Sequence, residues 1–226
     1  MTAVILDLDG TLADTAGDLV AAANACFLAR GEPPPLDAER DRSTALRGGR
    51  AMLRLGFERV RGAWTEEEVD ADYQPLLVHY ERAIDTHSRL FPGVEDALRL
   101  CLDRGWRLAV CTNKPERLAR ILLGRLGVDG LFHAVVGADT LPVRKPDPEA
   151  LRHAVARAGG EARRAVMVGD TETDHLTARA AGVPSILVTF GPEGEAIARL
   201  EPDALLGGFE ALPDLVERLL VAPAPG

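Results

Sequence analysis

The chain has few aromatic residues and a deficit of positive charge, and each shortage disfavours a class of partner. Only 4% of its residues are aromatic, which argues against a surface that stacks nucleic-acid bases. The net charge of −9 at pH 7 disfavours nucleic acid or an anionic membrane as the main partner. A bound cation and a few local Lys or Arg residues would still accommodate a small anionic substrate.

Cysteine is also scarce: Cys26, Cys101 and Cys111 lie far apart in the sequence. An odd number without short spacing disfavours a disulfide framework and a zinc site, and the five histidines also lack metal-ligand spacing. No basic segment or long apolar run marks the first residues, so neither a signal peptide nor a transmembrane helix is expected. We therefore expect a cytoplasmic protein.

Short apolar strands alternate with helical patterns along most of the 226 residues. The expected strands are Ala3–Leu8, Arg107–Cys111, Ala134–Gly137, Ala165–Val168 and Ser185–Thr189. The expected helices between them are Glu95–Arg104, Glu116–Leu126, Pro148–Ala158 and Asp174–Ala181. This alternation predicts an α/β fold whose parallel sheet is covered on both faces.

Residues 15–89 interrupt the alternation, because they contain no convincing strand. Their apolar spacing predicts helices at Asp18–Leu28, Thr44–Leu55 and Thr65–Ile84. We therefore expect an all-α unit, 15–89, inserted into an α/β core that consists of 1–14 and 90–221. The Pro- and Gly-rich tail, 222–226, is predicted to fray.

The most informative stretch is Asp7-Leu8-Asp9-Gly10-Thr11, at the end of the first apolar run. Two carboxylates so close together repel each other, which points to a divalent cation or to separate roles as nucleophile and acid. Polar residues also follow the later strands: Thr112-Asn113-Lys114, Arg144-Lys145-Pro146-Asp147 and Gly169-Asp170, with Asp174 beyond. Ligands of open α/β sheets bind at these strand ends, and this set of side chains fits Mg²⁺ with a phosphoryl group.

These segments resemble the four motifs of the haloacid dehalogenase superfamily, in its phosphatase branch. The helical insertion is similar to the family's C1-type cap, and the resemblance covers nearly the whole chain. The subfamily that it most resembles is the phosphoglycolate phosphatases. The resemblance implies a Rossmann-like core with a parallel sheet, plus an all-α cap.

The resemblance also implies the catalytic roles. Asp7 would be the nucleophile that forms an aspartyl-phosphate, and Asp9 the general acid and base. Mg²⁺ would be held by Asp7, the backbone carbonyl of Asp9 and Asp170, with Asp174 binding directly or through water.

The phosphoryl group and the rest of the substrate would have separate binding residues. Thr112, Asn113 and Lys145 would bind the phosphoryl oxygens. In the cap, Gly48 would let backbone approach a ligand, and Arg47 or Arg50 would meet a substrate carboxylate. Asn24 and Lys114 are further pocket candidates.

The resulting prediction is a Mg²⁺-dependent phosphatase for a small phosphorylated metabolite, and 2-phosphoglycolate is the first candidate substrate. We expect a monomer or homodimer with no nucleic-acid or membrane partner. Alternatives within the family are a sugar-phosphate phosphatase, a nucleotidase, a pyrophosphatase and a β-phosphoglucomutase-like enzyme. The alternative that is not an enzyme is a catalytically silent binding protein with the same fold. Asp9 argues against a dehalogenase, and the lack of lysine in 15–89 against a phosphonatase.

Overall fold

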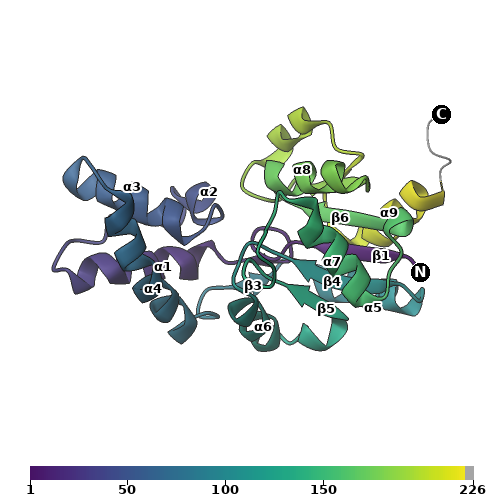
Figure 1. Ribbon diagram of the computed structural model, residues 1–226, viewed down its shortest axis with the longest axis horizontal. Helices are drawn as coiled ribbons and strands as arrows, with labels where there is room; N and C mark the ends of the chain where they lie inside the picture. Colours follow the sequence, from purple (N-terminus) through teal and green to yellow (C-terminus); the bar gives the residue numbers. More distant parts are fainter. Residues whose placement is uncertain (222–226) are drawn as a thin grey trace. The chain divides into compact units, whose positions relative to one another are not determined.

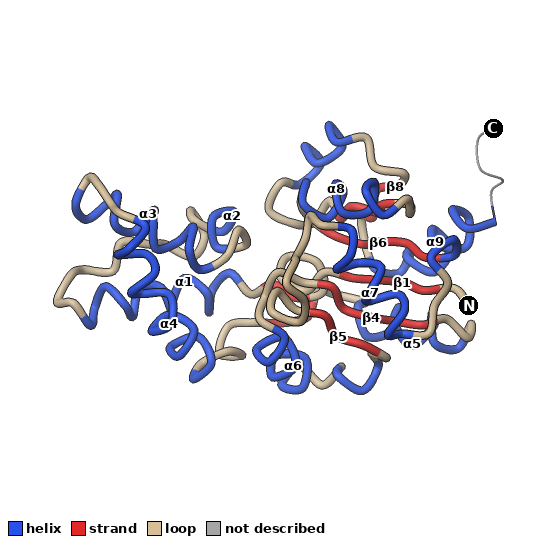
Figure 2. Tube along the Cα trace, viewed as in Figure 1, coloured by secondary structure: helices blue, strands red, loops and turns tan. Residues whose placement is uncertain are grey.

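A parallel sheet lies at the centre of the unit that contains the N-terminus. In the computed structural model, which describes residues 1–221, the strand order is β5-β4-β1-β6-β7-β8. The strands are β1 (Ala3–Leu6), β4 (Arg107–Cys111), β5 (Ala134–Val136), β6 (Ala165–Gly169), β7 (Ser185–Val188) and β8 (Ala204–Leu206). Figure 2 draws the strands of this sheet in red. All neighbouring pairs are parallel, so their carboxyl ends share one edge.

Helices cover this sheet, as its continuously apolar strands predict. They are α5 (Val94–Asp103), α6 (Glu116–Arg125), α7 (Pro148–Ala158), α8 (Glu172–Ala181) and α9 (Leu212–Val221). Helix α7 contacts β1, β4 and β5, whereas α8 contacts β6 and β7. Ala3 and Ile5 belong to the apolar cluster that includes α7, and the alternate residues Val4 and Leu6 are also fully buried. Strand β1 is therefore buried on both faces.

A second compact unit, Asp14–Arg89, is helical, whereas the first unit contains Met1–Ala13 and the chain from Leu90 onward (Figure 1). Its helices are α1 (Ala16–Ala29), α2 (Arg42–Ala45), α3 (Gly49–Arg61) and α4 (Glu66–Arg82). Phe27 and Phe57 pack edge to face in its core, with ring centroids 5.1 Å apart. Helix α4 begins with a capping box between Thr65 and Glu68.

The predicted α/β class with a parallel sheet is confirmed, but several boundaries differ. The first strand ends at Leu6 rather than Leu8, because the chain turns back so that Leu12 donates to the carbonyl of Leu8. The predicted helix Thr44–Leu55 is interrupted between α2 and α3. Strand β8 and the pair β2 (Ala13–Asp14) and β3 (Arg89–Leu90) were not predicted.

A frayed C-terminal tail and the absence of a transmembrane helix were also predicted. The tail 222–226 lies outside the described residues, so the predicted fraying stays a prediction. Within residues 1–221, no helix combines the length and apolar character needed to cross a membrane.

Candidate active site

The ends of three adjacent strands bring polar side chains together. Strand β1 pairs with both β4 and β6, so Asp7, Thr112 and Asp170 all follow neighbouring strands. The N–H of Asp7 donates to the carbonyl of Val168 at 2.9 Å, and that of Thr112 to Val136 at 2.9 Å. These bonds extend the ladder by one residue and hold the side chains at the sheet edge.

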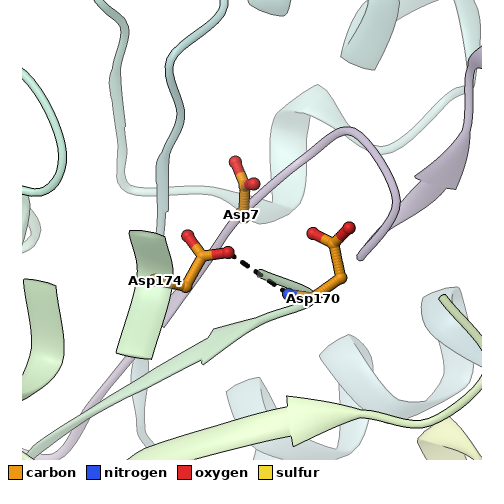
Figure 3. Close-up of side chains that lie close together, drawn as sticks. All are labelled: Asp7, Asp170 and Asp174. Carbon is orange, nitrogen blue, oxygen red and sulfur yellow. Dashed lines mark hydrogen bonds between the residues drawn. The ribbon is translucent and has the colours of Figure 1, made fainter. Parts of the chain in front are cut away.

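Asp7, Asp170 and Asp174 form a buried carboxylate cluster (Figure 3). One oxygen atom from each lies within 4.8 Å of those from the other two. Burial raises the pKa of Asp7 to about 6; Lys145 opposes the rise, and the charges of Asp174 and Asp9 add to it. Burial and the charges of Asp174 and Asp7 also raise the pKa of Asp170 well above its usual value. The cluster therefore resists being fully ionised by itself.

Two oxygen atoms in this cluster indicate which kind of ligand its residues suit. Asp7 Oδ1 and Asp170 Oδ2 are buried and have no hydrogen-bond partner among the described residues. Lys145 Nζ lies 3.0 Å from Asp7 Oδ1, but without hydrogen-bond geometry. Buried carboxylate oxygens without donors favour a cation, and an all-oxygen donor set suits a hard divalent ion. The residues present therefore fit a divalent metal.

The other oxygen of Asp170 is already engaged. Thr11 Oγ1 donates to Asp170 Oδ1 at 2.9 Å, which fixes the carboxylate and leaves Oδ2 for a cation. Thr11 belongs to the motif Asp7–Thr11, but no role was predicted for it. The contact joins residues 159 positions apart, a pairing that local patterns do not reveal.

Asp174 differs from its two neighbours because both of its oxygens accept hydrogen bonds. Oδ1 accepts from Lys145 Nζ at 2.6 Å. Oδ2 accepts from Thr171 Oγ1 at 2.7 Å and from the backbone N–H of Thr171 and Asp170 at 3.1 and 3.3 Å. Asp174 is the N3 residue of a capping box that begins α8. Its carboxylate thus joins the helix start to the lysine.

Lys145 is the cation of the cluster and is only 3% exposed. Burial lowers its pKa, but the charges of Asp174 and Asp7 outweigh this effect, and the pKa lies above its usual value. Asn113 Nδ2 donates to the backbone carbonyl of Lys145 at 3.0 Å. Lys145 therefore stays protonated between two carboxylates, on a loop anchored by the segment after β4.

Asp9 lies in the turn after Asp7, where Gly10 adopts a φ of 82°. Lys114 Nζ lies 2.7 Å from Asp9 Oδ1 and 2.9 Å from Oδ2. Both partners are largely buried, with side chains 4% and 15% exposed. Lys114 was predicted only as a further pocket candidate, since 105 positions separate it from Asp9 in the sequence.

The residues of the Asp14–Arg89 unit that were predicted to bind substrate differ in exposure and in their contacts. Arg47 is exposed, and Gly48 has a φ of 94° immediately before α3. Arg50 is paired with Asp70, and its guanidinium lies 4.5 Å from the ring centroid of Tyr73. Substrate binding by Arg47, Gly48 and Arg50 stays a prediction.

Asn24 has a structural role. Its Nδ2 donates to the carbonyl of Leu36 at 2.9 Å, and its Oδ1 accepts from the N–H of Leu36 at 3.0 Å. Both amide atoms therefore hold the connector after Pro33-Pro34-Pro35 in place.

Comparison with known proteins gives matches along nearly the whole chain. Residues 1–182 match the sequence model of the haloacid dehalogenase-like hydrolase family. A phosphoglycolate phosphatase from Agrobacterium fabrum is 41% identical over 219 residues, which cover 96% of this chain and 93% of the relative. A phosphoglycolate phosphatase from Caulobacter vibrioides is 41% identical over 223 residues, 98% of this chain and 94% of the relative.

A solved structure agrees with this similarity. The crystal structure of a predicted phosphoglycolate phosphatase from Haemophilus somnus has a TM-score of 0.84 and 25% sequence identity. The match covers 95% of this chain and 97% of that one.

Proposed function

The chain belongs to the haloacid dehalogenase-like hydrolases, and we propose that it is a Mg²⁺-dependent phosphatase with 2-phosphoglycolate as its substrate. The observation that carries the proposal is the buried cluster of Asp7, Asp170 and Asp174 around Lys145. The enzyme class follows from the family and from relatives that are phosphoglycolate phosphatases.

Asp7 is the proposed nucleophile. Its carboxylate attacks phosphorus and displaces the alkoxide, giving an aspartyl-phosphate that water then hydrolyses. Lys145, 3.0 Å from Asp7 Oδ1, offsets the negative charge that builds up as the two anions approach. Asp9 protonates the leaving oxygen and later takes a proton from the attacking water.

The phosphoryl group would be held at the same edge of the sheet. Thr112 is buried directly after β4, and its hydroxyl would donate to a phosphoryl oxygen, together with backbone N–H groups such as that of Asn113. A divalent metal, when bound, would reduce the repulsion between the attacking carboxylate and the phosphoryl oxygens.

We propose Asp7 and Asp170 as the direct carboxylate ligands of this metal, with the backbone carbonyl of Asp9. Each of the two carboxylates presents an oxygen without a hydrogen-bond partner among residues 1–221. Asp174 is better suited to positioning, because both of its oxygens already accept hydrogen bonds. It would contact the metal through water.

The cellular setting is also a proposal. Cys26, Cys101 and Cys111 are buried, and none forms a disulfide within the described residues. Burial raises the pKa of Cys111 to about 12, so its thiol is not reactive at neutral pH. These properties suit a cytoplasmic enzyme. The oligomeric state, a monomer or homodimer, stays a prediction.

A phosphate-release screen tests the function. With Mg²⁺, 2-phosphoglycolate should exceed sugar phosphates, nucleoside monophosphates and pyrophosphate by about a hundredfold in kcat/KM, or ~2.7 kcal/mol. EDTA should stop turnover and Mg²⁺ should restore it, whereas the larger Ca²⁺ should restore it poorly. A flat profile would reject 2-phosphoglycolate as the preferred substrate, and the absence of turnover with any of them would reject the phosphatase.

A further inference from the structure

Lys145, the cation of the proposed reaction, lies on an irregular loop. The Lys145 loop (residues 137–147) joins β5 to α7, and its residues 142–144 are exposed. Exposed loops move more readily than the elements that they connect. Lys145 Nζ nevertheless lies 3.0 Å from Asp7 Oδ1 and 2.6 Å from Asp174 Oδ1. Such placement requires anchors from outside the loop.

The first anchor is the side chain of Asn113, in the segment that follows β4. Its Nδ2 donates to the backbone carbonyl of Lys145 at 3.0 Å. This bond fixes the main chain at the residue whose side chain must be aimed. The contact proposed between Asn113 and a phosphoryl group uses the backbone N–H, so the side-chain amide is able to hold Lys145 at the same time.

The second anchor is Glu116, the first residue of α6. Thr140 Oγ1 donates to Glu116 Oε2 at 2.5 Å, and the backbone N–H of Glu116 donates to Asp139 Oδ1 at 2.8 Å. Thr140 Oγ1 also accepts from the N–H of Gly137 at 2.8 Å. A Cβ added at Gly137 would lie 2.2 Å from the backbone nitrogen of Glu116. The start of the Lys145 loop is therefore packed directly against the start of α6.

The charge of Glu116 strengthens this anchor. Its other oxygen, Oε1, accepts from Arg120 Nε at 2.9 Å. Burial by itself would raise the pKa of Glu116, but the hydroxyl of Thr140 and the guanidinium of Arg120 bring the pKa below its usual value. Glu116 is therefore ionised at neutral pH, and hydrogen bonds to an ionised acceptor are stronger than those to a neutral one.

We propose that Asn113 and Glu116 are positioning residues, which together hold the Lys145 loop against the segment after β4 and so keep Lys145 between its two carboxylate partners. Loss of either side chain lets the ammonium move away from the attacking carboxylate, and small displacements of a catalytic group are costly for kcat. The inference rests on the proposed function for the role of Lys145. The placement of Lys145, in contrast, is measurable without turnover.

Amine labelling tests this placement, because Lys114 and Lys145 are the only lysines of the chain. Acetic anhydride is applied briefly, and mass spectrometry follows the labelling of each lysine relative to the α-amino group. In Asn113→Ala and Glu116→Ala, Lys145 should react at least about fivefold faster than in the wild type, and Lys114 should change by less than about twofold, because a buried amine reacts only after local opening.

The same two variants should lower kcat for 2-phosphoglycolate by about tenfold or more and change KM by less than about threefold, because Lys145 acts on the transition state. Glu116→Gln keeps an acceptor for Thr140, so its effects should be smaller, and it is the variant to use if Glu116→Ala folds poorly. Thr65→Ala is the control. It removes the cap of α4 and should lower the urea midpoint without changing kcat or the labelling of either lysine.

Three results are decisive. Labelling of Lys145 at the wild-type rate in both alanine variants, with only a lower urea midpoint as in Thr65→Ala, would overturn the positioning role. Equal acceleration at Lys114 and Lys145 would also overturn it, because it would show general opening of the site. A wild-type enzyme inactive on every phosphomonoester would reject the proposed function itself, and the labelling would still decide whether Asn113 and Glu116 hold Lys145.

Discussion

At the scale of single residues, the site contains charges that oppose folding. The carboxylates of Asp7 and Asp170 are buried close together, and burial is the largest cause of the raised pKa of each. Each also presents an oxygen with no hydrogen-bond partner among the described residues. Strained electrostatics of this kind are common where chemistry takes place, and they make the site sensitive to pH and to cations.

Asp7→Asn should abolish turnover but stabilise the metal-free protein. The folded pKa of Asp7 is about 6, against an ordinary value of 3.8, so at pH 7.5 the folded state holds a charge that it disfavours. The variant should therefore raise the free energy of unfolding in EDTA by about 1–3 kcal/mol. Urea unfolding with a phosphate-release assay measures both effects.

The size of this effect should depend on pH. As the pH falls from 7.5 through 6 towards 4, wild-type Asp7 takes up a proton in the folded state, and the advantage of the variant should disappear. Asp103→Asn, at an exposed position in α5, should change unfolding by less than about 0.5 kcal/mol and leave activity intact. Residual turnover in Asp7→Asn near the wild-type rate would exclude Asp7 as nucleophile.

Protons should compete with the metal at the same oxygens. Because Asp7 has a pKa of about 6 and that of Asp170 is also raised, both groups must be deprotonated to bind a cation. The affinity for Mg²⁺ should fall by about tenfold or more for each pH unit below 6. Isothermal titration calorimetry between pH 5 and 8, in buffers of different ionisation enthalpy, should also detect proton release; affinity independent of pH would place the metal elsewhere.

At the scale of elements, the turn from β6 into α8 positions Asp170 and Asp174, and through Asp174 it also holds Lys145. Gly169 ends the strand, and Asp170 and Asp174 follow it. A Cβ added at Gly169 would collide with Cβ and Cγ of Asp174. Close approach of the helix start to the strand therefore requires glycine here, and this approach brings Asp174 within 2.6 Å of Lys145.

Gly169→Ala should displace Asp174 and loosen Lys145. We expect a loss of about 1–3 kcal/mol in unfolding free energy and at least about a hundredfold in kcat. Gly124→Ala is the matched control, since an added Cβ there would meet no atom of the described residues within 4 Å and the position is helical. It should be neutral or stabilising by up to about 1 kcal/mol. Unchanged activity in Gly169→Ala would contradict a role for this close packing.

The elements also show what the sequence can and cannot predict. Periodicity predicted α7 with its observed bounds, Pro148–Ala158, because Pro at the first turn and Gly159 at the end are local signals. The break before α3 was missed, since the helical pattern of Thr44–Leu55 does not reveal that Gly48 takes a positive φ. Strand β8 is only 3 residues long, too short for alternation to be distinguished from a loop.

The same limit applies to the site. The polar ends of β1, β4 and β6 indicated where ligands would bind, because parallel strands share one carboxyl edge. The pairing of Lys145 with Asp174 spans 29 positions and that of Lys114 with Asp9 spans 105. Such distant contacts depend on packing, so these residues could be proposed from the sequence, but these two pairings could not.

At the scale of the whole molecule, the proposed metal ligands belong to one unit. Asp7, Asp170 and Asp174 all lie in the part formed by Met1–Ala13 and the chain from Leu90 onward. The Asp14–Arg89 unit has its own internal supports. For example, Asp18 accepts hydrogen bonds from the N–H of His87 and from the N–H and hydroxyl of Ser88.

Mg²⁺ should therefore stabilise the two units unequally. A ligand that binds only the folded state contributes about 2.7 kcal/mol at a concentration of 100 times its Kd. Because the proposed ligands all belong to the first unit, amide hydrogen exchange should slow there, most of all in β1 and β6, and should change little in α1, α3 and α4. An Asp170→Asn variant, which alters a proposed ligand, should lose the effect. Equal slowing in residues 14–89 would show that the two units open together, and no slowing in β1 or β6 would reject the proposed metal site.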